Sequence, residues 1–196
     1  ITNGDSASSD NSNSASGAVY VYKRTGTTWV QEAYIKAVNN DASDGFGGSV
    51  SLSGDTLVVG AASETSNENT ITNGTTASSN NSNTRSGAVY VYKRTGTSWA
   101  QEAYIKAVNN ATYALFGASV SISDDTIAVG AYGERTNLTT ITNGTTIGSS
   151  TGDSTNSGAV YVYKRTGTSW AQEAFIKAVN KDEQDQFGVA VSISGD

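Results

Sequence analysis

The stretch Gly87–Asn109 reads GAVYVYKRTGTSWAQEAYIKAVN, and the chain contains it almost three times. It recurs with two changes over Gly17–Asn39 and with one change over Gly158–Asn180, so the copies start about 70 residues apart. Self-similarity at a fixed period is typical of repeat architectures, in which each unit buries its apolar surface against its neighbours. The 196-residue chain is therefore expected to be an array of similar units rather than one or two ordinary domains.

Within one unit, four short segments have the patterns of β-strands. The first alternates small polar with apolar residues, as a half-buried strand does, and the second is a nearly continuous apolar run that suits a strand buried on both faces. Helical spacing does not persist over three turns anywhere, although the good helix formers in Trp99–Asn109 leave a helix there as an alternative. The four segments are Phe46–Ser53, Thr56–Ala61, Ala88–Tyr92 and Trp99–Ala107.

Alternation assigns the side chains of the last two strands to faces. Val89 and Val91 point one way and Tyr90 and Tyr92 the other, so both faces of the third strand must be covered. The fourth strand is expected to lie at an edge, where its charges protect the edge from aggregation. Its two expected faces are Trp99, Gln101, Ala103 and Ile105 on one side, and Glu102, Tyr104 and Lys106 on the other.

A long Ser/Thr/Asn/Gly-rich loop, 63–86, separates the second strand from the third. Ile71 is its one large apolar residue and recurs as Ile1 and Ile141, so we expect it to pin the loop to the body of the unit. Loops on a rigid scaffold commonly carry binding, so recognition is expected in the regions 63–85 and 132–156.

The unit resembles the FG-GAP repeat of integrin-α-like β-propellers, in the bacterial surface-protein branch. The resemblance is carried by Phe46-Gly47 followed by Gly60-Ala61, by Phe116-Gly117 followed by Gly130-Ala131, by Phe187-Gly188, and by the GAVYVY strand. It implies a ring of about seven four-stranded blades, an extracellular or cell-surface location, and a role in adhesion or ligand binding. It also implies calcium in an Asp-rich loop, but the turns at 53–56 and 123–126 are too short and have too few carboxylates for that ion.

The expected fold class is an all-β repeat protein of four-stranded antiparallel propeller-type blades, about 70 residues per unit, with an incomplete ring in this chain. The expected units are a partial blade over 1–45, complete blades over 46–115 and 116–186, and the first strand of a further blade over 187–196. Two blades and two fragments do not close a ring, so we expect a longer repetitive polypeptide. The alternatives are an assembly of several chains joined head to tail and an open array of stacked blades.

Composition excludes several classes of function. The net charge of −6 argues against a nucleic-acid partner, and no apolar run reaches the roughly 20 residues of a membrane helix. The absence of His and Cys excludes a Ser-His-Asp or Cys-His triad and a His-ligated zinc site. We therefore expect no catalytic or cofactor-binding residues, and no enzyme activity.

Carboxylates supply the only metal candidates. Asp41 and Asp44 match Asp182 and Asp185, and calcium is a weak expectation there. The middle unit has alanine at both positions, so solvated loop acids explain the pattern better than a metal site does. Glu64 and Glu134 follow the Gly-Ala dipeptides. A glycosidase needs two carboxylates in a cleft, whereas a loop carboxylate paired with Lys, Arg or a turn needs none, and we favour the latter.

Each unit also contains an aromatic set and potential glycosylation sites. Aromatic platforms bind sugars, but aromatics at strand spacing more often pack between blades. The sets are Tyr20, Tyr22 and Trp29, then Tyr90, Tyr92 and Trp99, then Tyr161, Tyr163 and Trp170. The N-x-S/T pattern occurs at Asn73, Asn110, Asn137 and Asn143.

The expected function is an extracellular structural or adhesive propeller module. The alternatives are a carbohydrate-binding propeller, a subunit of an extracellular filament built by head-to-tail blade completion, and a polysaccharide-cleaving enzyme. The expected partners are other copies or flanking repeats of the same polypeptide, with glycans or surface proteins as ligands, and without nucleic acid or membrane insertion.

Overall fold

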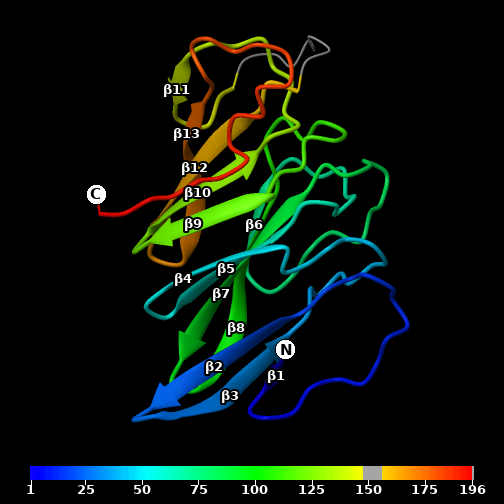
Figure 1. Cartoon of the computed structure of the whole chain (residues 1–196), viewed down its shortest axis with the longest axis vertical. Coiled ribbons are helices and arrows are strands. Elements are labelled where there is room, and N and C mark those ends of the chain that lie inside the picture. The colour runs from blue at the N-terminus through cyan, green and yellow to red at the C-terminus, as the bar shows by residue number, and fades with distance from the viewer. Residues whose placement is uncertain (148–155, 196) are drawn as a thin grey trace.

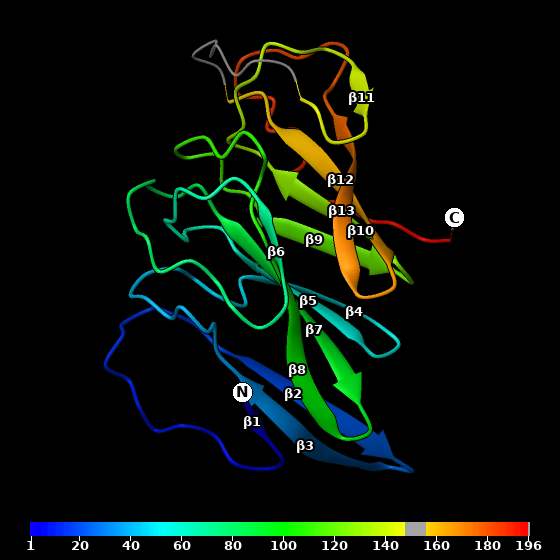
Figure 2. The same ribbon diagram turned by 180° about the vertical axis from the view of Figure 1, so that it is seen from behind.

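The computed structural model describes residues 1–147 and 156–195, and these residues form strands and loops without a helix. Three antiparallel sheets follow one another along the long axis of the molecule (Figure 1). We call them blade 1, blade 2 and blade 3 in chain order. The long connections lie along one side of this row and the tight hairpin turns lie along the other, as the reverse view also shows (Figure 2). The expected all-β class with antiparallel, propeller-type blades is thereby confirmed.

Blade 2 contains all four predicted strands and one more. Its spatial order is β4-β5-β7-β8-β6, and blade 3 repeats that order as β9-β10-β12-β13-β11, whereas blade 1 has the order β1-β3-β2. The strands of blade 2 are β4 (Ser49–Ser53), β5 (Thr56–Ala61), β6 (Ile71–Asn73), β7 (Ala88–Thr95) and β8 (Ser98–Ile105). Those of blade 3 are β9 (Ser119–Ser123), β10 (Thr126–Ala131), β11 (Ile141–Asn143), β12 (Ala159–Thr166) and β13 (Ser169–Ile176). Those of blade 1 are β1 (Thr2–Asn3), β2 (Val19–Thr25) and β3 (Thr28–Ile35).

The fifth strand comes from the middle of the polar loop. β6 pairs antiparallel with β8, with Ile71 opposite Ile105, and the Ile71 side chain packs against the apolar core. Ile71 therefore anchors the loop, as expected, but it does so by extending the sheet. β8 is consequently not an edge strand over its second half, and the helix alternative for this segment is wrong.

The core lies between blades rather than within them. Tyr90 and Tyr92 of β7 belong to a buried cluster shared with blade 1, and Val89 and Val91 of the same strand belong to a second cluster shared with blade 3. Both faces of β7 are thus covered, as alternation predicted. Each large side chain buried in this way contributes on the order of 1.5–3 kcal/mol to burial free energy.

A β-bulge overturns the expected faces of β8. Tyr92 lies opposite Gln101 but Val91 lies opposite Ala103, so Glu102 is an extra residue in the ladder. Alternation breaks at a bulge, because two residues on one strand then oppose one residue on its partner. As a result Trp99 packs with the blade 1 cluster, whereas Ala103 packs with the blade 3 cluster.

The Phe-Gly and Gly-Ala dipeptides hold neighbouring blades in contact. A Cβ atom on Gly60 would lie 2.0 Å from the carbonyl oxygen of Gly117 in the next blade, so only glycine allows this approach. The Ser49 hydroxyl donates to the same carbonyl at 2.7 Å. Phe116 packs edge-on against Tyr161, with ring centroids 5.1 Å apart. The repeat signature is therefore explained by packing between blades.

Segment 187–195 makes the contacts with blade 3 that the start of blade 3 makes with blade 2. The Ser119 hydroxyl donates to the Gly188 carbonyl at 2.8 Å, and the Ile193 N–H donates to the Ser121 hydroxyl at 3.1 Å. The Ile122 N–H donates to Ser51 in the same way at the preceding boundary. Residue 196, which the sequence analysis assigned to a further blade, lies outside the described residues.

Candidate functional site at the blade junctions

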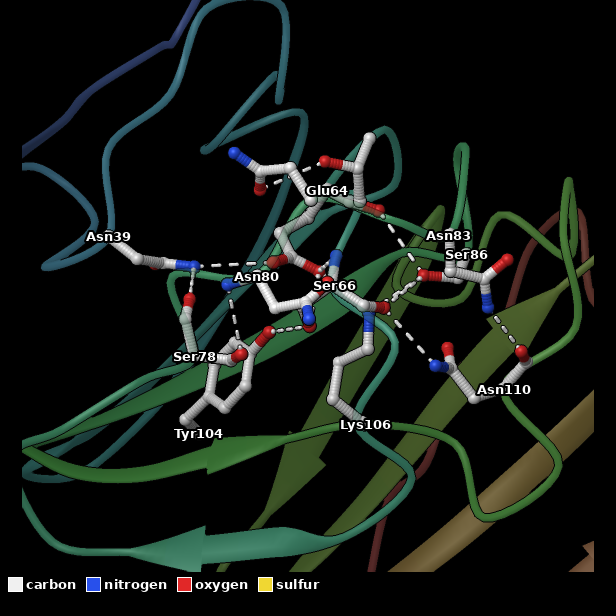
Figure 3. A network of polar contacts seen from close by, with 12 residues as sticks. Asn39, Glu64, Ser66, Ser78, Asn80, Asn83, Ser86, Tyr104, Lys106 and Asn110 are labelled. Carbon is white, nitrogen blue, oxygen red and sulfur yellow. Dashed lines mark hydrogen bonds and ion pairs between the residues drawn. The ribbon is translucent and has the colours of Figure 1, made fainter.

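A fully buried ion pair lies at the loop end of each complete blade. Lys106 Nζ is 2.6 Å from Glu64 Oε2, and both side chains have no exposed surface (Figure 3). In blade 3, Lys177 and Glu134 form the equivalent pair at 2.8 Å. The fold brings the partners together because the glutamate follows the second strand of its blade and the lysine follows the fourth. The interpretation of Glu64 and Glu134 as loop carboxylates paired with a cation is confirmed.

Additional hydrogen bonds offset the desolvation cost of the buried ion pair. Glu64 Oε2 accepts from the Ser66 N–H at 3.1 Å, and Glu64 Oε1 accepts from the side chain of Asn39 at 3.2 Å. Lys106 also donates to the Ser86 hydroxyl at 2.8 Å. Burial lowers the pKa of Lys106, and the neighbouring Glu64 carboxylate opposes that shift. Charges removed from water are costly unless paired and hydrogen-bonded in this way, and this network meets that condition.

The same network fixes the long loop of blade 2 at its start, middle and end. Ser66, near the start, donates or accepts a 2.7 Å hydrogen bond with the Tyr104 hydroxyl. The Ser78 carbonyl, in the middle, accepts from Asn39 at 2.7 Å, and Ser86, at the end, donates to the Ser66 carbonyl at 3.0 Å. The loop expected to carry recognition is therefore held in a defined shape by contacts with blade 2 and with Asn39, which follows the last strand of blade 1.

An asparagine from the preceding blade completes each junction. Asn39, which follows β3 of blade 1, accepts at 2.6 Å from the Tyr90 hydroxyl of blade 2. Asn109 accepts from the Tyr161 hydroxyl of blade 3 at 2.6 Å, and donates to Glu134 at 2.9 Å. The sequence analysis missed these asparagines. Their recurrence at the end of each GAVYVY segment was the available signal.

A second set of polar contacts clamps the blades at the hairpin side. Arg94 of blade 2 pairs with Glu32 of blade 1 at 3.1 Å, and the Trp99 indole N–H donates to the same carboxylate at 3.1 Å. Arg165 and Trp170 make the same contacts with Glu102 across the next boundary. The expectation that Glu102 protects an exposed edge is therefore wrong, because its carboxylate lies between two blades.

The turn that would hold calcium in the resembled family is used differently here. Asp55 Oδ1 accepts from Arg94 Nε at 2.7 Å, and Asp125 Oδ1 accepts from Arg165 Nε at 2.7 Å. The hydrogen bond to Arg94 lowers the pKa of Asp55. A four-residue turn whose carboxylate is bound to an arginine does not fit the six to eight oxygen ligands of calcium, so we derive no role for the ion there.

The four aspartate candidates lie in two different environments. Asp41 is partly exposed and accepts from the side chain of Asn81 at 2.9 Å, whereas Asp44 is buried. Burial raises the pKa of Asp44 to about 7, and the nearby charges of Glu64 and Asp41 contribute to the increase. Asp182 and Asp185 are exposed, and the Asp182 N–H donates to Asp185 at 2.6 Å. Within residues 1–147 and 156–195, no three potential His, Cys, Asp or Glu ligands lie together.

The four candidate glycosylation sites also differ in accessibility. Asn73, Asn137 and Asn143 are exposed, although the side-chain oxygen of Asn73 accepts from the backbone N–H of Trp170 at 2.8 Å. The amide nitrogen of Asn110 donates to the Ser66 carbonyl at 3.1 Å and is thus engaged in the junction. Loop region 132–156 is described only in part, because residues 148–155 lie outside the described residues.

The repeated sheets, the interblade core and the two sets of polar contacts define a β-propeller-type repeat module. The family model for the FG-GAP repeat matches residues 29–92 and 99–163, which together make up more than half of the chain. The chain therefore belongs to the FG-GAP repeat family, and the expected resemblance is confirmed. A comparison with curated proteins finds no match.

Proposed function

We propose that this protein is an extracellular structural or adhesive module, in which stacked blades present their long loops on one side for recognition. The observation that carries this proposal is the buried Glu64–Lys106 network, which holds the loop at Ser66 and Ser86 through blade 2 and at Ser78 through Asn39 of blade 1. A loop ordered before binding loses little conformational entropy when it meets a partner. FG-GAP repeats are typical of extracellular or surface proteins, and the described residues contain no helix long and apolar enough to span a membrane.

The adhesive role is tested by replacing the exposed loop tip. Residues Ser79–Ser82 are changed to Gly-Ser-Gly-Ser, and binding to immobilised fibronectin, collagen and mucin is measured by surface plasmon resonance. We expect the change to abolish binding without altering the circular dichroism spectrum. The matched control is Thr97→Ser, in the turn on the opposite side, which should bind as the wild type does. Absence of binding to every surface, or binding that survives the loop change, would contradict the role.

A second candidate function is assembly through blade faces, so that the module forms part of a longer array or filament. It is favoured by the outer face of blade 1, where Tyr20, Tyr22 and Trp29 are exposed and no other blade of the described residues packs against them. In blades 2 and 3 the equivalent residues are buried against a neighbouring blade that supplies a glutamate. The complementary glutamate of blade 3, Glu173, is itself exposed. The occupant we propose for the face is another blade of this kind.

Exchange of charges tests that assembly. Sedimentation of the wild type should show concentration-dependent association, which Arg24→Glu or Glu173→Arg alone should weaken about tenfold. An equimolar mixture of the two single variants should recover association, because every contact between unlike variants then joins opposite charges. A wild type that remains monomeric at all concentrations would refute association between copies of this chain.

A further inference from the structure

The tetrapeptide Ile-Thr-Asn-Gly occurs once in each unit, at 1–4, 71–74 and 141–144. Asparagine is a thermally labile residue, because the backbone nitrogen of the next residue can attack its side-chain amide carbon. A following glycine favours this attack, since it has no Cβ to obstruct the approach and adopts the required backbone conformations easily. By sequence alone, Asn3, Asn73 and Asn143 are therefore equivalent candidates for this reaction.

The backbone around the three asparagines is also equivalent. Each asparagine is the last residue of the short outer strand of its blade, β1, β6 or β11. The glycines that follow have φ angles of +101°, +117° and +89°, with open space where a Cβ would lie. Each glycine N–H donates to a carbonyl of the adjacent strand, at 2.7, 2.6 and 2.6 Å. This hydrogen bond must open before the nitrogen can react, but it does not distinguish the three copies.

The side-chain amides differ, because the following blade binds only two of them. The Oδ1 atom of Asn3 accepts from the Trp99 N–H at 2.8 Å, and its Nδ2 donates to the Trp99 carbonyl at 3.4 Å. The Oδ1 atom of Asn73 accepts from the Trp170 N–H at 2.8 Å. Asn143 is exposed, and within residues 1–147 and 156–195 its side chain makes no hydrogen bond. Its amide can therefore rotate towards the next backbone nitrogen.

The strand that carries Asn143 is also less well covered than its counterpart. Ile141 of β11 is 61% exposed, whereas Ile71 of β6 is partly buried and packs against the apolar core. A three-residue strand with few buried contacts opens locally at a low free-energy cost. The hydrogen bond from the Gly144 N–H to the Glu173 carbonyl should therefore break more often than the equivalent bond of Gly74.

We propose that Asn143 is a site of spontaneous deamidation, and that contact with the following blade protects Asn3 and Asn73. The Gly144 nitrogen gives its proton to hydroxide and bonds to Asn143 Cγ, and the Cγ–Nδ2 bond breaks with release of ammonia. Water then opens the resulting five-membered imide at either carbonyl, which gives aspartate or isoaspartate. No oxidant, reductant or partner is needed, so this chemistry is independent of the adhesive role.

The reaction would change this end of the protein in three ways. It adds one negative charge to a chain whose net charge is already −6. It removes the N-x-T pattern at Asn143, so the same residue can no longer accept a glycan. The isoaspartate product also lengthens the backbone by one methylene at the end of β11, which disturbs its pairing with β13.

The test is incubation of the full chain at pH 8 and 37 °C, followed by peptide mapping with mass spectrometry. Deamidation raises the mass of a peptide by about 1 Da. We expect Asn143 to react at least about tenfold faster than Asn73, because its amide is free and its strand opens more readily. In concentrated urea the two should react at similar rates, since both are followed by Gly-Thr-Thr and the fold no longer separates them.

Two matched variants identify the source of isoaspartate, which is measured by enzymatic methylation with a labelled methyl donor. Asn143→Gln should remove most of the signal from the folded chain, because glutamine forms the corresponding ring far more slowly. Asn73→Gln should leave the signal unchanged. The proposal is overturned if Asn143 reacts no faster than Asn73 in the folded chain, or if the signal persists in Asn143→Gln.

Discussion

The outer face of blade 1 and the corresponding face of blade 2 have the same aromatic residues in opposite environments. Trp29 is 64% exposed and Tyr22 is 54% exposed, whereas Trp99 is 4% exposed and Tyr92 is 1% exposed. The strands that carry them are nearly identical in sequence. The difference therefore arises from the neighbouring blade, which supplies both the apolar cover and the Glu32 carboxylate that the Trp99 indole needs. In this architecture these aromatic residues are buried by the contact between two neighbouring blades and not by their own blade.

The strongest test of this comparison is to replace the tryptophan at the equivalent position of each face. Trp99→Ala should lower the free energy of unfolding by about 4 kcal/mol, because it empties a packed interface and leaves Glu32 without the indole donor. Trp29→Ala should change it by about 0.5 kcal/mol or less, as an exposed residue does. Urea unfolding followed by circular dichroism measures both values. Equal losses for the two variants would show that the blade itself, and not its neighbour, determines the contribution.

The buried lysine gives a second comparison between the same blades. Lys106→Met leaves the Glu64 carboxylate buried without a cation and should cost about 3 kcal/mol. Lys36→Met is the matched variant, because Lys36 donates to the Ser16 hydroxyl and forms no ion pair within the described residues, so its cost should be about 1 kcal/mol.

Denaturant titration of a third variant, Lys106→Met/Glu64→Leu, separates loss of charge pairing from loss of packing. It should recover most of the stability, because both buried charges are gone and the apolar volume is similar. Failure to recover would mean that the hydrogen bonds from Glu64 to the loop, rather than the ion pair, stabilise the junction.

The smallest expected effect is a pH dependence of the free energy of unfolding. It comes from Asp44, whose position in the next unit is occupied by Ala114. The pKa of Asp44 is raised to about 7 by burial, so the folded protein holds this proton more tightly than the unfolded chain does. Its contribution to stability is therefore complete below the ordinary carboxyl pKa and is lost as the pH rises through about 7. Between pH 5 and pH 8 the loss should be about 2.5 kcal/mol, because the pH then covers about two units below the folded pKa at roughly 1.4 kcal/mol per unit.

Calorimetry of the variant Asp44→Ala checks whether stability falls as the pH rises. The substitution introduces the residue that the next unit has at this position. The variant should melt higher than the wild type at pH 8, and its melting temperature should vary less between pH 5 and pH 8. Asp185→Ala is the control, because this exposed carboxylate lies outside the buried junction. A wild type whose stability rises with pH over this range would contradict the raised pKa.

Most of the fold followed from local pattern. The alternation of Val89 to Tyr92 predicted a strand covered on both faces, and the continuous apolar run Thr56–Ala61 predicted a buried one. Two features could not be predicted, because they depend on how strands pair rather than on the local sequence pattern. The three residues of β6 are too few to show a period, and the bulge at Glu102 reverses faces without leaving a signal in composition.

The site was harder to predict than the fold. Glu64 was identified as a paired carboxylate, but its partners Lys106 and Asn39 are distant in sequence and meet it only because consecutive blades pack together. For the same reason Glu102 was mistaken for an edge charge. Polar residues between repeats can be assigned a partner only when the relative position of the blades is known.

The short strand β6 has a consequence for how the units can diverge. It fixes the chain before Gly74, and the junction fixes it again at Ser86, so the intervening stretch is a loop with both ends anchored and one further contact at Ser78. Ile141 lies 70 positions after Ile71, but Gly158 lies 71 positions after Gly87, so the third copy has gained a residue between the anchors. Lengthening such a loop costs little, because closure entropy grows only slowly with length. This loop can therefore change in length without shifting the strands, and the surface of a unit can diverge while its sheet stays in register.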